Sequence, residues 1–143
     1  MESFREGCFL ENVRQPTKKM MAALQSSGLL FLDSACMCSS SCRLASGATI
    51  TSGDVIYLQS ASSLPFCAGQ VHCFLQFSFG EVAFVEKYMA GDKALSTLVS
   101  KWNVPTQRHL TFVSLEEILC SVTYSSAKGK VTCLTPPYLL ASQ

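Results

Sequence analysis

The pattern of apolar and polar residues changes near Thr49, where weak periodicity gives way to short alternating runs. From there on, segments rich in β-branched and aromatic residues are separated by Gly, Ser, Asp and Pro, which is typical of an all-β domain. The pattern predicts strands near 55–59, 70–78, 81–88, 110–113, 121–124 and 131–134. We therefore expect a mainly β domain over 49–137.

Turn-forming residues indicate how these strands are joined. Gly53-Asp54 predict a turn before the first strand, and Phe79-Gly80 predict a tight hairpin between the second and third strands. In the run SSAKGK, Gly129 can adopt a positive φ, which predicts a turn between the last two strands.

Residues 1–48 have weaker patterning and form an N-terminal segment of the same single globular unit. Thr17 is a potential N-cap, and the apolar residues that follow it predict a short helix over 18–27, stopped by Gly28. The run LLFLD fits a buried strand or a continuation of that helix, and periodicity does not decide between them. The run CMCSSSCRLASGA predicts a Cys/Ser-rich loop.

A long segment between the third and fourth strands, MAGDKALSTLVSKWNVPTQRH, predicts a helical insertion. Asp92 can cap a helical turn that Pro105 ends, with Leu95, Leu98 and Val99 on one side. Ser114, followed three residues later by Glu117, has the spacing of a capping box and predicts one further helical turn. Long ordered insertions often carry binding function, so this one is a candidate site.

Composition narrows the class of protein. A length of 143 residues suits one domain, and 48% hydrophobic against 15% charged residues indicates a folded globular chain. A net charge of +1 gives little general attraction to nucleic acid. No apolar run approaches a membrane span, and the N-terminus lacks the pattern of a signal peptide, so we expect a soluble intracellular protein whose eight cysteines are mostly buried thiols.

Candidate catalytic and metal-binding residues are few. Cys36, Cys38 and Cys42 offer three thiolates, but the chain contains no C-x-x-C pair and a fourth zinc ligand would have to come from elsewhere. His72 and Cys73 are adjacent on a predicted strand, where neighbours face opposite sides. Without a nucleophile motif or a phosphate-binding loop, the sequence predicts no enzyme and no cofactor. A zinc site at the three cysteines stays open beside the simpler interpretation of a Cys-rich loop, which we favour, and a distant pair of Cys67 or Cys120 with His109 stays open without a motif to support it.

Aromatic residues offer a stronger indication of binding. Tyr57, Phe66, Tyr88 and Trp102 fall near predicted strand ends or in the insertion. Such rings could form a cage for a methylated ammonium, stack on bases, or fill the core. Trp102 lies between Lys101 and Asn103 ahead of Pro105, and we expect it to be partly exposed.

Three runs in this region resemble the start of a bromo-adjacent homology (BAH) domain. These are GDVIYL, PFCAGQVHCFLQF and GEVAFVEKY, within a similar region of about 49–137. Barrel segments of proteins derived from transposable elements look similar as well. The resemblance implies a small SH3-like barrel of five or six strands that recognises partners in chromatin, without catalysis. The chain lacks the Trp-Tyr pair and the Arg-Pro run of BAH domains, which argues against methyl-lysine recognition.

Two function classes follow from these observations. The first is a nuclear interaction module that binds a protein or peptide through the insertion and a strand edge beside it. The second is a barrel that binds single-stranded nucleic acid, with Lys87, Lys93, Lys101 and Arg108 on phosphates and Trp102 or Tyr88 on a base. The predicted partner-binding residues are Tyr57, Phe66, Tyr88, Lys101, Trp102 and Arg108.

The run VHCFLQFSFGEVAFV also predicts association. Strict alternation places Phe74, Phe79 and Val85 on the face opposite Val71, Cys73 and Leu75. Both faces would then be apolar, and a homodimer or a partner protein is expected to cover the second one.

Overall fold

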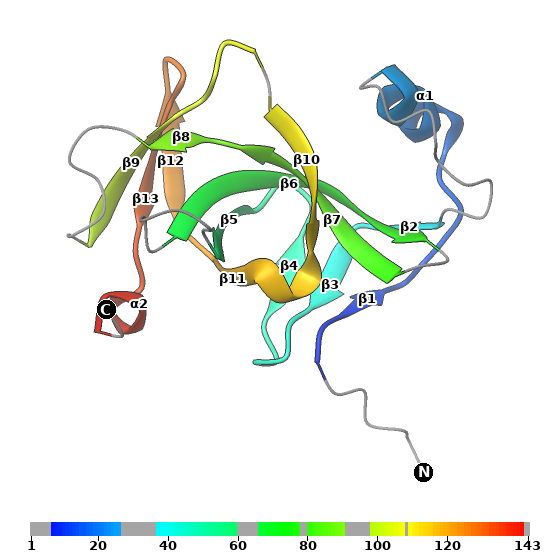
Figure 1. The fold of residues 1–143 in the computed structure, drawn as a ribbon, viewed down its shortest axis with the longest axis horizontal. Helices are drawn as coiled ribbons and strands as arrows, with labels where there is room; N and C mark the ends of the chain where they lie inside the picture. The colour runs from blue at the N-terminus through cyan, green and yellow to red at the C-terminus, as the bar shows by residue number, and fades with distance from the viewer. Residues whose placement is uncertain are drawn as a thin grey trace.

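The chain forms a mainly β structure, as predicted. The computed structural model describes residues 7–26, 37–59, 66–77, 80–90, 98–107 and 109–141 (Figure 1). The first strands and the first helix are β1 (Phe9–Glu11), α1 (Lys18–Ser26), β2 (Met37–Ser39), β3 (Ser41–Arg43), β4 (Thr49–Thr51), β5 (Val55–Gln59), β6 (Phe66–Phe77) and β7 (Gly80–Lys87). They are followed by β8 (Met89–Ala90), β9 (Val99–Asn103), β10 (His109–Ser114), the 3-10 helix η1 (Leu115–Glu117), β11 (Ile118–Ser121), β12 (Tyr124–Ala127), β13 (Lys130–Leu134) and α2 (Pro137–Ala141).

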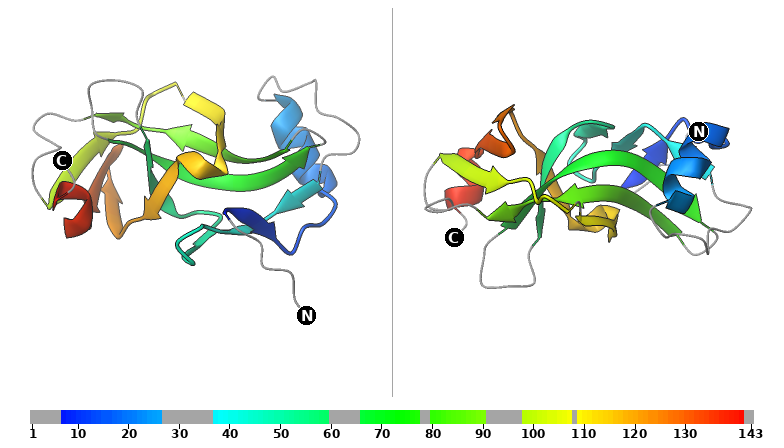
Figure 2. Two further views of the ribbon diagram at one scale, coloured as in Figure 1. Left: turned by 60° about the horizontal axis from the view of Figure 1, so that its bottom comes forward. Right: turned by 90° about the horizontal axis from the view of Figure 1, so that it is seen from above.

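The described strands form three antiparallel sheets and not the closed barrel that was predicted. A small sheet has the order β1-β3-β4, and the central sheet has the order β10-β7-β6-β5-β11 with β2 added to β6. The third, which we call the end sheet, has the order β12-β13-β9-β8. It lies at one end of an elongated molecule, and α1 lies at the opposite end (Figures 1 and 2).

The two long central strands have both faces buried, and a β-bulge sets which residues face which side. Val71 pairs with Val85 and Cys73 pairs with Phe84, so His72 is an extra residue on β6. The predicted strict alternation is therefore wrong from this point on. Val71 and Phe74 share one face, whereas Cys73 and Leu75 share the other.

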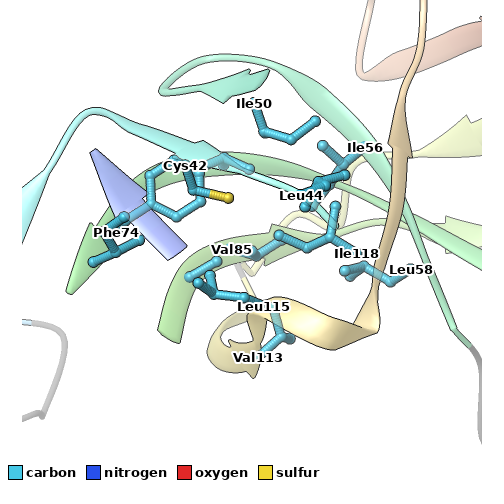
Figure 3. Close-up of a cluster of buried hydrophobic side chains, with 13 residues drawn as sticks. Cys42, Leu44, Ile50, Ile56, Leu58, Phe74, Val85, Val113, Leu115 and Ile118 are labelled. Carbon is cyan, nitrogen blue, oxygen red and sulfur yellow. The ribbon is translucent and has the colours of Figure 1, made fainter. Parts of the chain in front are cut away.

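The predicted interface residues are part of the protein's own core. Phe74 and Val85 are both 0% exposed and pack with Leu10, Cys42 and Ile50 in a central cluster (Figure 3). The sequence pattern predicted that a partner protein would cover these residues. In the structure, the small sheet and the chain around η1 cover them instead. Phe79 lies outside the described residues.

The N-terminal segment contributes strands where a loop was predicted. β2 pairs with β6 and β3 pairs with β1 and β4, so the Cys/Ser-rich run is ordered by sheet pairing. The predicted helix is confirmed, and its N-cap forms because the Met20 amide donates to Thr17 Oγ1 at 3.2 Å. The LLFLD run and Gly28 lie outside the described residues.

The predicted helical insertion is also corrected. Val99 to Asn103 form β9, an internal strand of the end sheet, while Asp92 and Leu95 lie outside the described residues. One helical turn does follow Ser114, but no capping box forms, because the Ser114 hydroxyl bonds the Glu116 carboxylate. The strand predicted at 121–124 is two strands, β11 and β12.

Two predicted turns are confirmed by their backbone geometry. Gly53 has a φ of +93°, and the Asp54 carboxylate accepts the Thr51 amide at 2.9 Å. Lys128 and Gly129 both have positive φ, at 52° and 75°, as a two-residue hairpin loop requires. This loop joins β12 to β13.

Candidate interaction surface on the end sheet

The large apolar side chains that the described part of the chain exposes gather on or beside the end sheet. They are Met89, Leu98, Val99, Tyr124, Leu134 and Tyr138, with exposed fractions between 40% and 61%. Met89, Val99, Tyr124 and Leu134 are in its strands, Leu98 immediately precedes β9, and Tyr138 is in α2. Exposed apolar residues scattered singly need no explanation, but a cluster of them marks a binding surface.

The outer face of the end sheet has a defined pattern because β9 alternates between exposed and buried residues. Cross-strand pairing arranges its outward side chains in rows, and each row is two residues, or about 7 Å, from the next. The first row holds Val99 and Leu134, the second holds Lys101, Thr132 and Ser125, and the third holds Met89, Asn103, Lys130 and Ala127. The first row is therefore apolar throughout, and each of the other two rows carries a lysine, with Met89 in the same row as Lys130.

A groove of about 370 Å³ adjoins the apolar row. We call it the Leu134 groove, and it is lined by Leu98, Ser121, Val122, Thr123, Leu134, Thr135, Pro136 and Pro137. Its shape depends on backbone bonds, since the Leu134 amide donates to the Thr123 carbonyl at 2.9 Å and the Thr135 amide donates to the Leu98 carbonyl at 2.7 Å. These two bonds hold the end of β13 and Thr135 against the segments that contain Thr123 and Leu98.

β12 is an edge strand of this sheet, and all four of its residues are exposed. The hairpin register and the bond between Leu134 and Thr123 set the alternation of its hydrogen bonds. Ser125 and Ala127 bond with β13, whereas the amide and carbonyl groups of Tyr124 and Ser126 point away from it. β12 has no charged residue and no proline, the usual devices that protect an edge from pairing.

The C-terminal part of the chain, which forms most of the end sheet, has an excess of basic residues. From Lys93 to the C-terminus the sequence contains five Lys or Arg residues and two acidic residues, Glu116 and Glu117, both of which lie in η1. Lys101, Lys128 and Lys130 are exposed on the end sheet or in its hairpin. The outer face is therefore positive as well as partly apolar.

Three of the predicted aromatic site residues lie beneath this surface and not on it. Tyr57, Phe66 and Trp102 are at most 1% exposed, so the expected exposure of Trp102 is wrong. Tyr57 and Phe66 stack with ring centroids 4.3 Å apart, and Trp102 lies 6.3 Å from Tyr57. These three rings therefore fill the core, which is one of the roles that the sequence left open.

Buried hydroxyl groups tie this aromatic cluster to the end sheet. The Tyr57 hydroxyl lies 2.5 Å from Ser100 Oγ and 2.8 Å from Thr135 Oγ1, and the Trp102 indole donates to Ser100 Oγ at 2.8 Å. Burial raises the pKa of Tyr57 above its ordinary value, so the phenol stays neutral. Thr135 also lines the Leu134 groove, so this network of buried hydrogen bonds lies directly beneath the candidate surface.

The remaining predicted residues are placed as follows. Lys101 is exposed in the second row, and Tyr88 is half-buried against the aromatic cluster, where burial raises its pKa to about 12. Arg108 and Lys93 lie outside the described residues. The structure thus brings Lys101 to the surface and all four predicted aromatic residues to the interior or its margin.

Sequence reasoning missed Leu98, Val99 and Leu134 as surface residues. A signal was present, since V-S-K-W-N alternates with a period of two and contains a β-branched and an aromatic residue, as strands do. The apolar spacing of Leu95, Leu98 and Val99 suggested a helix instead. A short run fits either period, and pairing with β13 determines the outcome.

A second hollow, of about 400 Å³, lies beside η1. Its lining includes Cys8, Glu81, Phe112 and Glu116. Both carboxylates are already engaged, because Gln76 donates to Glu81 at 3.0 Å and Ser114 donates to Glu116. The bond from Ser114 lowers the pKa of Glu116. Its large apolar lining residues, Val82, Phe112 and Leu115, are half-buried or buried, whereas Leu98 and Leu134 of the Leu134 groove are exposed.

Cysteine and histidine residues form no evident reaction centre in the described part of the chain. Cys38 and Cys42 belong to different apolar clusters, and Cys36 lies outside the described residues. No three His, Cys, Asp or Glu side chains are grouped there to hold a metal. The bulge turns His72 toward Glu86, with Nε2 3.3 Å from Oε1, so the expectation that His72 and Cys73 face opposite sides is wrong.

Comparisons with known proteins do not assign a family. No family model matches the chain, and no curated protein sequence matches it. None of the helices in the described part of the chain is long and apolar enough to cross a membrane.

Proposed function

We propose that the protein is a non-catalytic interaction module that binds an extended segment of a partner protein at the end sheet. The observation that carries this proposal is the gathering of exposed large apolar side chains around this one sheet. The other apolar faces of the described sheets are covered by the chain itself. A surface that stays apolar in such a molecule is best explained by a partner that covers it.

The edge of the end sheet supports an extended partner. A segment that adds beside β12 would bond the outward amide and carbonyl groups of Tyr124 and Ser126. Its side chains would then follow the rows of the outer face, and an apolar one would enter the Leu134 groove. Backbone bonds would supply affinity, and the groove would supply specificity.

The resemblance to BAH domains is the reason to place this activity in chromatin and in the nucleus. A methyl-lysine cage is not part of the proposal, because Trp102, Tyr57 and Phe66 are buried in the aromatic cluster. Burial of Trp102 also removes one of the two rings expected to stack on a base, and the other, Tyr88, is half-buried against the aromatic cluster. The surface lysines remain available to either partner, so nucleic acid is kept as an outcome of the experiments.

The test is selection from a random dodecapeptide display library on the full chain, followed by amide hydrogen exchange with an enriched peptide. We expect added protection at Tyr124 and Ser126, and weaker binding by Leu134→Ser. Ser126→Pro removes an outward amide and is expected to abolish binding while the protein stays folded.

Ser125→Pro is the matched control on the same strand. It removes an amide that bonds β13, and we expect it to destabilise the hairpin itself. Peptides that bind Leu134→Ser and Ser126→Pro as well as the wild type would show that the end sheet is not the site.

A further inference from the structure

We infer that the partner segment of the end sheet is acidic, with an apolar side chain and a carboxylate four residues apart on the same face. This inference rests on the proposed function, since it specifies the chemistry of the segment that the end sheet would bind. It is carried by the order of the rows on the outer face, where the first row, Val99 and Leu134, has no lysine and the second and third rows carry Lys101 and Lys130.

The position of each lysine supports this spacing. Lys130 is in the third row, two rows or four residues from Leu134, and it pairs with Ala127 of the edge strand. Strands lie about 4.8 Å apart, so a segment added to β12 would run about 10 Å from β13, within the combined reach of a lysine and a glutamate side chain. Lys128, in the hairpin loop at the end of β12, lies near the same end of the segment.

Lys101 adds to the positive electrostatic potential of the outer face but would not contact the added segment directly. It is a diagonal neighbour of Lys130 on the adjacent strand, and a segment at β12 would lie about 14 Å away from its strand. No acidic residue is present in the strands of the end sheet to neutralise these three charges. Unpaired like charges on one face favour a partner of opposite sign and oppose a basic one.

Nucleic acid and an anionic membrane are less suited to this face. Single-stranded nucleic acid needs exposed rings for stacking beside the basic residues, whereas the exposed rings Tyr124 and Tyr138 are not in the rows that carry the lysines, since Tyr124 pairs with the buried Cys133. A membrane would not use the outward backbone groups of β12. A peptide uses the edge, the groove and the lysines together.

The library selection provides the first measurement. Enriched dodecapeptides are expected to carry Asp or Glu four residues from a Leu, Ile, Val or Phe. The tightest peptide is then compared with a copy in which Asp and Glu are replaced by Asn and Gln. We expect roughly three- to tenfold weaker binding of the neutral copy at low salt, and a smaller difference at 0.5 M salt.

Variants of the protein locate the effect. Lys130→Gln is expected to remove most of the preference for the acidic copy while the neutral copy binds as before. Lys18→Gln, which removes an exposed lysine from α1 at the other end of the molecule, is the matched control and should change neither affinity. Leu134→Ser should weaken both copies equally.

The outcomes separate this inference from the proposed function. Enriched peptides that need Leu134 and Ser126 but have no acidic preference would overturn the inference and leave the proposed function standing. Enriched peptides that do not depend on the end sheet, or none at all, would overturn both. Tighter binding of oligo(dT) or of phosphatidylserine vesicles, lost in Lys130→Gln, would also overturn the inference.

Discussion

The hydroxyl group of Tyr57 links the end sheet to the central sheet. Tyr57 is in β5, whereas its hydrogen-bond partners are Ser100 in β9 and Thr135 just after β13. All three residues are at most 3% exposed. A buried hydroxyl that loses its partner is costly, so single atoms decide how firmly the candidate surface on the end sheet is supported.

Removal of this hydroxyl should lower stability. We predict that Tyr57→Phe decreases the free energy of unfolding by about 1–3 kcal/mol, because Ser100 and Thr135 lose a buried partner. Urea denaturation measures the change. Tyr124→Phe, at an exposed position of the edge strand, should change stability by less than about 0.5 kcal/mol. Equal effects of the two substitutions would contradict the role of the network.

Phe74 provides a second prediction for a single residue. Its side chain is 0% exposed in the central cluster, so Phe74→Ala should cost about 3–5 kcal/mol through lost burial and a cavity. The mass in solution, measured by light scattering, should be the same as that of the wild type. Met89→Ala, at a 61% exposed position, is the control for stability. A stable Phe74→Ala protein with altered assembly would restore the interface hypothesis.

The bulge in β6 shows how one extra residue determines which face of the sheet the following side chains occupy. His72 is not paired with any residue of β7 in the strand register, and the residues on either side of it keep their alternation across the pair. His72 and Cys73 therefore lie on the same side, where the His72 ring is 6.0 Å from Phe84. Both apolar faces of β6 are preserved because the bulge absorbs the extra residue.

Deletion of His72 should consequently be tolerated better than a new shift in register. Without His72, Val71 and Cys73 are consecutive and still face opposite sides, so we predict a folded protein destabilised by roughly 1–3 kcal/mol. Insertion of one Ala between Leu75 and Gln76 would instead turn Phe77 to the wrong face and prevent folding. Circular dichroism and thermal melting compare the two variants. Equal loss of structure in both would argue against this role of the bulge.

At the scale of the whole molecule, three sheets share their cores through the two long central strands. Several cysteines lie within these cores, and burial raises the pKa of Cys42 to about 12 and that of Cys133 to about 11. Both thiols therefore stay protonated in the folded state at a pH where they would ionise in the unfolded chain. The fold favours the neutral form of both groups.

Stability should therefore fall at alkaline pH. A raised folded pKa gives stability that is complete below the unfolded pKa of about 9 and is lost as pH rises toward 11–12. We predict a loss of about 1 kcal/mol per pH unit for each of these thiols above pH 9, measured by urea denaturation. A Cys42→Ala variant should lose less between pH 9 and 10.5, whereas Met89→Ala, at an exposed position without a titratable group, should behave like the wild type. Identical slopes in all three proteins would contradict the assignment.

The sequence by itself determined the features that depend on neighbouring residues. Thr17 and the apolar residues after it predicted α1, and Gly53 and Gly129 predicted turns, because caps and positive φ are local requirements. The strand at Val55–Gln59 was predicted with its observed bounds, since alternation and turn residues are both contained in the segment itself. The mainly β class follows from such local signals.

Only the tertiary structure decided which faces are covered. Phe74 and Val85 required strands from the N-terminal segment to be buried, and Trp102 required Tyr57 and Phe66, which are distant in sequence. The bulge at His72 depends on register with β7, and the strand at Val99–Asn103 depends on pairing with β13. Exposure is a property of contacts between distant segments, so the sequence pattern supplied candidates and packing determined which of them reach the surface.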